Sequence, residues 1–266
     1  MYIWCVKKHT LTAVAGFAIL FLLYHAAEYM ILFKNSAIGF LAFQTLFFVA
    51  AYFIAKWQRK PGLAAWGLDG SKPFLKHLLS GLLMGGLLYG TTFCISLFLG
   101  VEKVTTVPGF AEILAPLGLF IFGSFFSSFS EDVLTRGYVY HHLKGKVTAT
   151  WVVFISATIY LFNHIYRLDD GFVTWLYLFL LGVLFVIPLL LTQRLWFTGG
   201  LHWAGNGTFY FTHEIIKTEE SNGPVSANTV FIIVILLFIP LNYYLLKRTG
   251  LVKQPEKPIG NAVVVN

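Results

Sequence analysis

The chain has 266 residues, of which 19 are basic and 12 acidic, so only 12% carry a charge, against about 25% in typical soluble domains. Apolar residues make up 57% of the chain, and the mean hydropathy is +0.73. A soluble domain of this size would need more charge to cover its surface. The composition therefore excludes an ordinary soluble globule, a disordered chain and a DNA-binding module, and it indicates a polytopic membrane protein.

Apolar runs of about 20 residues, the length needed to span a bilayer, recur along the chain. They cover residues 11–33, 37–55, 78–99, 113–130, 147–166, 172–191, 195–211 and 229–246. The first continues too far for the apolar region of a signal peptide, and the seventh is short and rich in glycine. Because the runs are apolar throughout and lack the alternation of barrel strands, they predict an all-α membrane helix bundle with about eight transmembrane helices.

The basic residues are distributed unequally between the two sides that eight spans would create. Fourteen fall on the side of the termini: Lys7, Lys8, Lys56, Arg59, Lys60, Lys72, Lys76, Lys144, Lys146, Arg194, Lys247, Arg248, Lys253 and Lys257. Four fall on the other side: Lys34, Lys103, Arg167 and Lys217. The positive-inside rule then predicts that both termini are cytoplasmic. We expect an integral protein of a bacterial-type plasma membrane, whose net charge of +7 meets anionic lipid and not nucleic acid.

The chain shows no internal repeat, and its two cysteines, Cys5 and Cys94, form neither a disulfide framework nor a metal-binding pattern. We therefore expect one integral-membrane domain over residues 1–250, followed by a mobile cytoplasmic tail over residues 251–266. The polar stretch 213–227 is typical of a solvated loop. On the first helix, His25 and Glu28 are spaced to pair with each other.

An acidic pair, Glu131 and Asp132, directly follows an uncharged run. On a helix, Asp132 and Arg136 are four residues apart and can pair on one face. Glu131 points about 100° away, which leaves it free to act as a general base. The competing interpretation is that these residues only mark the cytoplasmic end of a helix.

Two further polar pairs lie in later apolar runs. Tyr160 and His164 share one helix face, and so do His202 and Asn206, which lie among three glycines. A histidine and an asparagine in an apolar segment are costly unless they form hydrogen bonds. They indicate either part of a reaction site or polar contacts between helices, since ionisable residues inside a membrane are usually functional.

The order of these three motifs resembles the CAAX-protease and bacteriocin-processing family (CPBP, or Abi), whose relatives are the type II CAAX prenyl endopeptidases. The family's motifs are Glu-Glu-x-x-x-Arg, Phe-x-x-x-His and His-x-x-x-Asn/Asp. The resemblance covers about residues 110–211 and includes the continuation Arg136-Gly137-Tyr138. Two positions depart from the pattern, because Asp132 replaces the second glutamate and Tyr160 replaces the phenylalanine.

The resemblance implies an intramembrane endopeptidase of glutamate type that acts on a membrane-anchored protein or peptide. Glu131 and His164 would activate water, and His202 and Asn206 would form the oxyanion site. Arg136 would hold the acidic pair, with Asp132 and Tyr160 in support. No metal cofactor is expected. A zinc-dependent version, similar to a metalloendopeptidase, would bind the ion through Glu131, His164 and His202 with an open fourth position, but the His-Glu-x-x-His signature is absent.

Two other functions remain open from the sequence: a non-catalytic bacteriocin-immunity or scaffold protein, and a small transporter that uses the acids for proton coupling. The missing repeat argues against the transporter. A single reaction site requires Glu131 and His164 to lie close together, but the hydropathy scheme places them at opposite ends of their runs, almost a membrane apart. We therefore expect the fourth helix to continue to His142 or Leu143, and the fifth to pass His164 towards Asp169.

Overall fold

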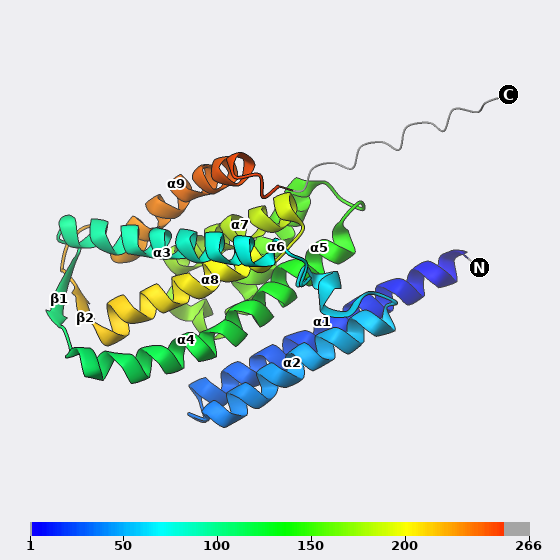
Figure 1. Ribbon diagram of the computed structural model, residues 1–266, viewed down its shortest axis with the longest axis horizontal. Helices are drawn as coiled ribbons and strands as arrows, with labels where there is room; N and C mark the ends of the chain where they lie inside the picture. Colours follow the sequence, from blue (N-terminus) through cyan, green and yellow to red (C-terminus); the bar gives the residue numbers. More distant parts are fainter. Residues whose placement is uncertain (1, 253–266) are drawn as a thin grey trace.

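Helices form nearly all of the regular structure of residues 2–252, the part of the chain that the computed structural model describes (Figure 1). The helices are α1 (Tyr2–Leu32), α2 (Ala37–Trp57), α3 (Phe74–Phe98), α4 (Phe110–Asp132), α5 (Tyr138–Leu143), α6 (Ala149–Asn163), α7 (Phe172–Thr192), α8 (Trp196–Phe209) and α9 (Ala227–Arg248). The all-α fold class is confirmed. Nearly all of the predicted tail, residues 253–266, lies outside the described residues.

Shorter segments complete the fold. There are two 3-10 helices, η1 (Gly62–Trp66) and η3 (Ile165–Asp170), and two π-helical segments, η2 (Val133–Gly137) and η4 (Tyr210–Ile215). The strands β1 (Glu102–Thr106) and β2 (Lys217–Glu220) pair antiparallel. The predicted stretch 213–227 is largely exposed or half-buried, as expected, but it is not a loop throughout, because η4 and β2 occupy part of it. Strand pairing between segments more than a hundred residues apart has no local sequence signal.

Six helical segments within residues 2–252 are long and apolar enough to cross a membrane: 10–32, 37–57, 74–98, 110–143, 172–192 and 227–248. The predicted count of eight is not confirmed. Helix α6 has 15 residues and α8 has 14, both short of the roughly 20 that a full span requires. The protein is nevertheless a polytopic membrane helix bundle.

The longest element is a continuous rod in which α4 passes through the π-helical η2 into α5, from Phe110 to Leu143. The predicted continuation of the fourth helix to Leu143 is confirmed. At 1.5 Å per residue the 34-residue rod is about 50 Å long. Glu131 consequently lies well inside the rod and not at a helix end, where hydropathy alone had placed it.

The predicted continuation of the fifth helix as far as Asp169 is wrong. Helix α6 ends at Asn163, and His164 leaves the helical conformation with φ −87° and ψ 53° before η3 begins. The cause is local, because His164 Nδ1 donates a hydrogen bond to the carbonyl oxygen of Tyr160 (2.8 Å). That carbonyl would accept the backbone N–H of His164 if the α-helix continued.

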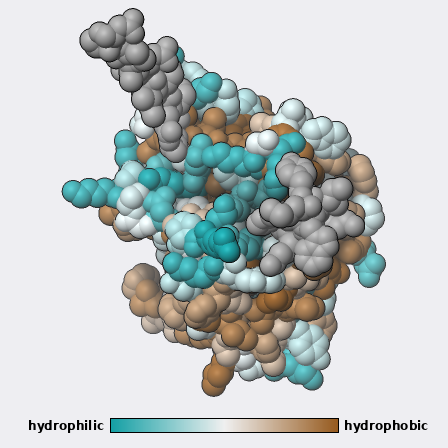
Figure 2. All heavy atoms as spheres, turned by 90° about the vertical axis from the view of Figure 1, so that its right-hand side faces the viewer, coloured by the Kyte–Doolittle hydropathy of each residue, from teal (hydrophilic) through white to brown (hydrophobic). Residues whose placement is uncertain are grey.

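The bundle has two different ends. At the end on the right of Figure 1, here called the basic end, Lys144 Nζ donates to Gln193 Oε1 (3.0 Å) and Lys76 Nζ to the carbonyl of Thr249 (3.3 Å). Figure 2 shows hydrophilic residues gathered on this end, above a hydrophobic flank. The opposite end, here called the strand end, carries β1, β2 and the turn between α1 and α2.

Helix α8 lies against α3 through glycines. A Cβ atom at Gly81 or Gly85 would collide with the carbonyl oxygens of Phe197 and Leu201, respectively. Small residues let two helix backbones approach this closely, as is common in membrane bundles. The close approach holds α8 in the interior, between α3 and α4 (Figure 1), and so fixes the helix that carries His202.

We predict that Gly85→Ala destabilises the protein by about 1–3 kcal/mol, because the added methyl group overpacks the contact between α3 and α8. The matched control is Gly86→Ala on the same helix, where a Cβ meets no atom within 4 Å. There the better helix propensity of alanine raises stability by about 0.5–1 kcal/mol. Thermal unfolding in detergent measures both, and equal effects of the two substitutions would contradict the packing.

Candidate active site

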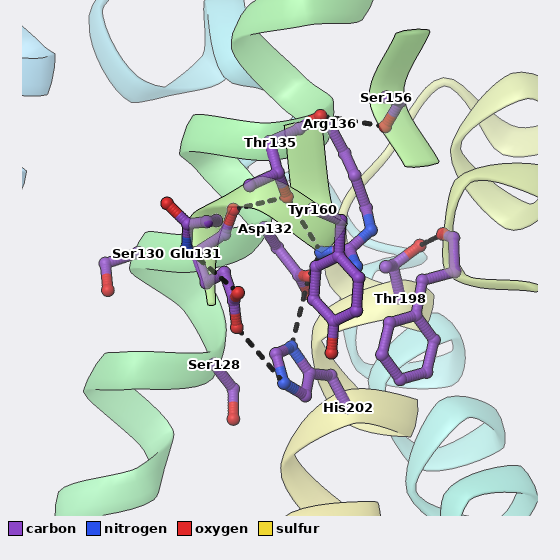
Figure 3. Close-up of polar contacts among 12 residues, drawn as sticks. Ser128, Ser130, Glu131, Asp132, Thr135, Arg136, Ser156, Tyr160, Thr198 and His202 are labelled. Carbon is purple, nitrogen blue, oxygen red and sulfur yellow. Dashed lines mark hydrogen bonds and ion pairs between the residues drawn. The ribbon is translucent and has the colours of Figure 1, made fainter. Parts of the chain in front are cut away.

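The carboxylate of Glu131 is the point at which three elements meet (Figure 3). Glu131 is 4% exposed on the last turn of α4. Its Oε1 accepts a hydrogen bond from Asn163 Nδ2 of α6 (3.0 Å), and its Oε2 lies 3.5 Å from His202 Nε2 of α8. His164 Nδ1 is 3.8 Å from Oε1. The structure thus brings Glu131, His164 and His202 together, although they come from three different helical segments.

Asp132 and Arg136 form the predicted ion pair one turn apart, and both side chains are fully buried. The guanidinium also lies over two aromatic rings, 4.4 Å from the centroid of Tyr160 and 4.8 Å from that of Phe185, a favourable position for a cation. Arg136 therefore balances the charge of Asp132 and is not a hydrogen-bond donor to Glu131 in the described residues.

His202 is held in one orientation by the acids on α4. Its Nδ1 lies 3.2 Å from Asp132 Oδ1, and a carboxylate can only accept, so this nitrogen carries a proton. Phe185 stacks on the imidazole, with ring centroids 4.9 Å apart. The other nitrogen, Nε2, consequently faces Glu131. Asp132 thus serves two groups at once, since it neutralises Arg136 and sets the tautomer of His202.

His164 uses its Nδ1 to cap α6, through the hydrogen bond to the Tyr160 carbonyl. Among the side chains of residues 10–252 its Nε2 has no hydrogen-bond partner, and the side chain is 19% exposed. Nε2 is therefore the atom that His164 can offer to a substrate or to water. The 3.8 Å between Nδ1 and Glu131 is too long for a hydrogen bond.

The sequence predicts that His202 and Asn206 form one oxyanion site, but in the structure their side chains have different partners. Asn206 lies one turn after His202 on α8, but its Nδ2 donates to Ser128 Oγ of α4 (3.0 Å), while His202 turns towards the two acids. Asn206 still lines the same cavity as Glu131, His164 and His202. Its amide can reach a substrate oxygen if that oxygen replaces Ser128 as the acceptor.

Two cavities meet at these residues. The larger cavity, of about 800 Å³, contains Glu131, His164, His202 and Asn206 in its wall, together with many apolar side chains of α1, α2 and α4. Its volume lies in the usual range of ligand pockets. The smaller cavity, of about 210 Å³, shares Tyr160, His164 and Asn206 with it. The candidate site is therefore accessible to a ligand although its charged groups are buried.

The side chains do not fit the zinc-dependent alternative. Zinc would need lone pairs from Glu131, His164 and His202 at one point, yet the nitrogen of His164 nearest to Glu131 already donates to a backbone carbonyl. Among the side chains of residues 10–252 there is no group of three or more His, Cys, Asp or Glu that could hold a metal ion. The resemblance to a metalloendopeptidase is accordingly not supported.

Sequence reasoning missed several residues of the site. Asn163 donates to Glu131, Ser128 accepts from Asn206, and Phe185 covers both Arg136 and His202. Asn163 had a usable signal, because a buried amide beside His164 in an apolar run must find a polar partner. Phe185 had none, since it is one of many phenylalanines in apolar runs.

Comparison with known proteins tests the resemblance directly. The chain matches no curated protein and no solved structure. A family described as Type II CAAX prenyl endopeptidase Rce1-like does match, over residues 113–208, a segment that contains the acidic pair, Tyr160, His164, His202 and Asn206. Residues 113–208 are therefore similar to the Rce1-like family, and the resemblance of this segment to the CPBP family is confirmed.

Proposed function

We propose that the protein is an intramembrane endopeptidase of glutamate type, in which Glu131 activates the water that attacks a peptide carbonyl. The observation that carries this proposal is the position of the Glu131 carboxylate. It lines a cavity within the bundle, and two histidines lie within 4 Å of it. Arg136 forms its ion pair with Asp132 and not with Glu131. The match to a protease family supports peptidase activity in general.

The chemical steps balance without a cofactor. Glu131 takes a proton from water as the water oxygen bonds to the scissile carbonyl carbon, which gives a tetrahedral oxyanion. The oxyanion collapses, the C–N bond breaks, and the proton passes from Glu131 to the leaving amine. Asn163 holds Oε1 by its hydrogen bond, which leaves Oε2 as the oxygen that faces His202 and the water.

Asn206 supplies a donor to the developing charge, and each histidine becomes a donor at Nε2 when its ring takes up a second proton, because Nδ1 already carries one. The Nδ1–H of His202 is anchored on Asp132, so a proton on Nε2 would be directed into the cavity. His164 Nε2 is available from the other side, because Nδ1 is engaged with Tyr160. Asn206 donates to the oxyanion once the substrate oxygen displaces Ser128 from its amide.

The wall of the larger cavity indicates the substrate class. It includes Ile31, Leu41, Leu119, Phe120 and Phe122, so an extended peptide with apolar neighbours, carried by a membrane-anchored protein or peptide, suits it better than a charged soluble chain. The lipid bilayer is the second partner, and no nucleic acid is involved. We propose a bacterial-type plasma membrane with cytoplasmic termini as the location.

We predict that Glu131→Gln abolishes proteolysis while the protein still folds. The amide keeps the shape of the carboxylate and can still face Asn163, but it cannot accept a proton from water, and loss of a general base typically costs about 10²–10⁴-fold in rate. The measurement is cleavage of a library of quenched peptides by the reconstituted protein. Glu219→Gln, at an exposed ion pair with Lys103, is the control that keeps full activity. Full proteolysis by a folded Glu131→Gln protein would favour a scaffold or immunity role for the site.

The two acids of the motif differ in their expected effect on stability. We predict that Asp132→Asn destabilises the protein by about 3–5 kcal/mol, because it leaves the fully buried Arg136 without a counter-charge. Glu131→Gln removes no such partner and changes stability by less than about 1 kcal/mol. Thermal unfolding in detergent compares them. If Glu131→Gln proved the more destabilising of the two, Arg136 would be balanced by the other acid.

A further inference from the structure

Two polar residues of α1, His25 and Glu28, take no part in the proposed hydrolysis. Both lie outside residues 113–208, the segment that matches the protease family. Helix α1 packs mainly along α2 and touches the other helices much less (Figure 1). Glu28 nevertheless lines the larger cavity together with Glu131, and His25 is only 7% exposed. The pair on α1 therefore belongs to the surroundings of the active site.

The imidazole of His25 lies between two backbone carbonyl oxygens. Its Nδ1 is 2.9 Å from the carbonyl oxygen of Phe21, one turn earlier in α1, and its Nε2 is 3.0 Å from that of Asn163 in α6. A carbonyl oxygen only accepts hydrogen bonds, whereas a neutral imidazole has one donor and one acceptor. Both contacts can be hydrogen bonds only when both ring nitrogens carry a proton, which is the imidazolium form.

Glu28 supplies the opposite charge that a buried imidazolium requires. Its Oε2 lies 3.8 Å from His25 Nε2, and its Oε1 accepts a hydrogen bond from the hydroxyl of Tyr24 (3.3 Å). Among the side chains of residues 10–252, Glu28 Oε2 is buried and has no hydrogen-bond partner. The charge of His25 is therefore the interaction that stabilises this oxygen.

The carbonyl that His25 Nε2 contacts belongs to Asn163, the last residue of α6. The carbonyl groups at the end of a helix have no partner within that helix, and the helix dipole favours a cation beside them. His25 offers both a donor and a positive charge, and it does so from a different helix. We call this contact between His25 and the Asn163 carbonyl the α6 cap.

The side chain of Asn163 connects the α6 cap to the active site. Its Nδ2 donates a hydrogen bond to Glu131 Oε1 (3.0 Å), while its backbone carbonyl is the group that His25 holds. Both groups belong to one residue, so a shift of the backbone at the end of α6 would move the amide away from the carboxylate. A displacement of about 1 Å in a positioning group can cost roughly 10²-fold in rate.

We propose that His25 is a positioning residue of the active site: as an imidazolium paired with Glu28, it holds the end of α6 at Asn163. It thereby keeps the Asn163 amide in place on Glu131 Oε1, so that Oε2 stays free for water. The effect on catalysis rests on the proposed peptidase function, whereas the charged α6 cap does not.

The charge state of His25 is tested by NMR of the protein labelled with ¹⁵N-histidine, in lipid nanodiscs at neutral pH. His25→Gln, which lacks the signal, assigns it. We expect both ring nitrogens of His25 to show the shifts of protonated nitrogen, and Glu28→Gln to return one of them to the unprotonated range. An unprotonated nitrogen at His25 in the unsubstituted protein would overturn the proposal, and so would an unchanged His25 signal in Glu28→Gln. The measurement needs no activity, so its failure is distinct from failure of the peptidase proposal.

The positioning role is tested with two amide substitutions of His25. In His25→Gln the amide reaches the place of Nε2 and can still donate to the Asn163 carbonyl, whereas the shorter His25→Asn can reach only the carbonyl of Phe21. We expect His25→Asn to lower kcat about 10–100-fold with little change in KM, and His25→Gln to keep most of the activity. Tyr29→Phe, at an exposed position of α1, is the control that changes neither constant. Equal losses in His25→Gln and His25→Asn would contradict the α6 cap.

A double-mutant cycle separates positioning from a general loss of stability. In an Asn163→Ala background the amide on Glu131 is already absent, but the backbone carbonyl that His25 caps remains. We expect His25→Asn to lower the melting temperature equally in both backgrounds, but to lower kcat only when the Asn163 amide is present. Equal losses of kcat in both backgrounds would overturn the proposal. If His25→Asn does not fold, Glu28→Gln takes its place in the cycle, because it weakens the α6 cap and leaves His25 unchanged.

Discussion

The buried ion pair between Asp132 and Arg136 is the interaction on which the rest of the site depends. Both side chains have no exposed area, and an unpaired charge in such surroundings would cost several kcal/mol. Asp132 must therefore stay beside Arg136, and its second contact, with His202, brings α8 to α4. Because the rings of Tyr160 and Phe185 cover the guanidinium, α6 and α7 are held at the same point. The remaining acid, Glu131, keeps its charge available.

Two interruptions of regular helix and one close contact between helices give this pair its surroundings. The π-helical η2 carries Arg136, and there the Thr135 carbonyl accepts from Ser156 Oγ of α6 (2.8 Å); π-helical turns are frequent at functional sites for this reason, since they free backbone groups. The end of α6 at His164 turns that imidazole out of the helix. The glycine contacts of α8 with α3 allow His202 to lie deep in the bundle. Each of these three features places one residue of the site: Arg136, His164 and His202.

The sequence predicts the parts of this site that depend on spacing along one helix. The pairing of Asp132 with Arg136 follows from four-residue separation, and the continuation of the fourth helix to Leu143 follows from the need to bring Glu131 near His164. What it does not predict depends on contacts across the fold. The end of α6 is set by a side chain bonding to a backbone carbonyl, the β1–β2 pairing joins distant segments, and the short α6 and α8 differ from spans by a few residues only.

The peptidase that we propose must bring an apolar chain and water to the carboxylate of Glu131, and the two cavities have walls of different chemistry. The larger one offers apolar walls of α1, α2 and α4, whereas the smaller one is bordered by Glu102, Arg167 and His213. Tyr160, His164 and Asn206 belong to both walls, so the two cavities adjoin at these residues. Because His164 commits only Nδ1 to the backbone, its Nε2 remains available for a ligand at this shared wall. His164, where α6 ends, is thus the one histidine of the site that lines both cavities in the described residues.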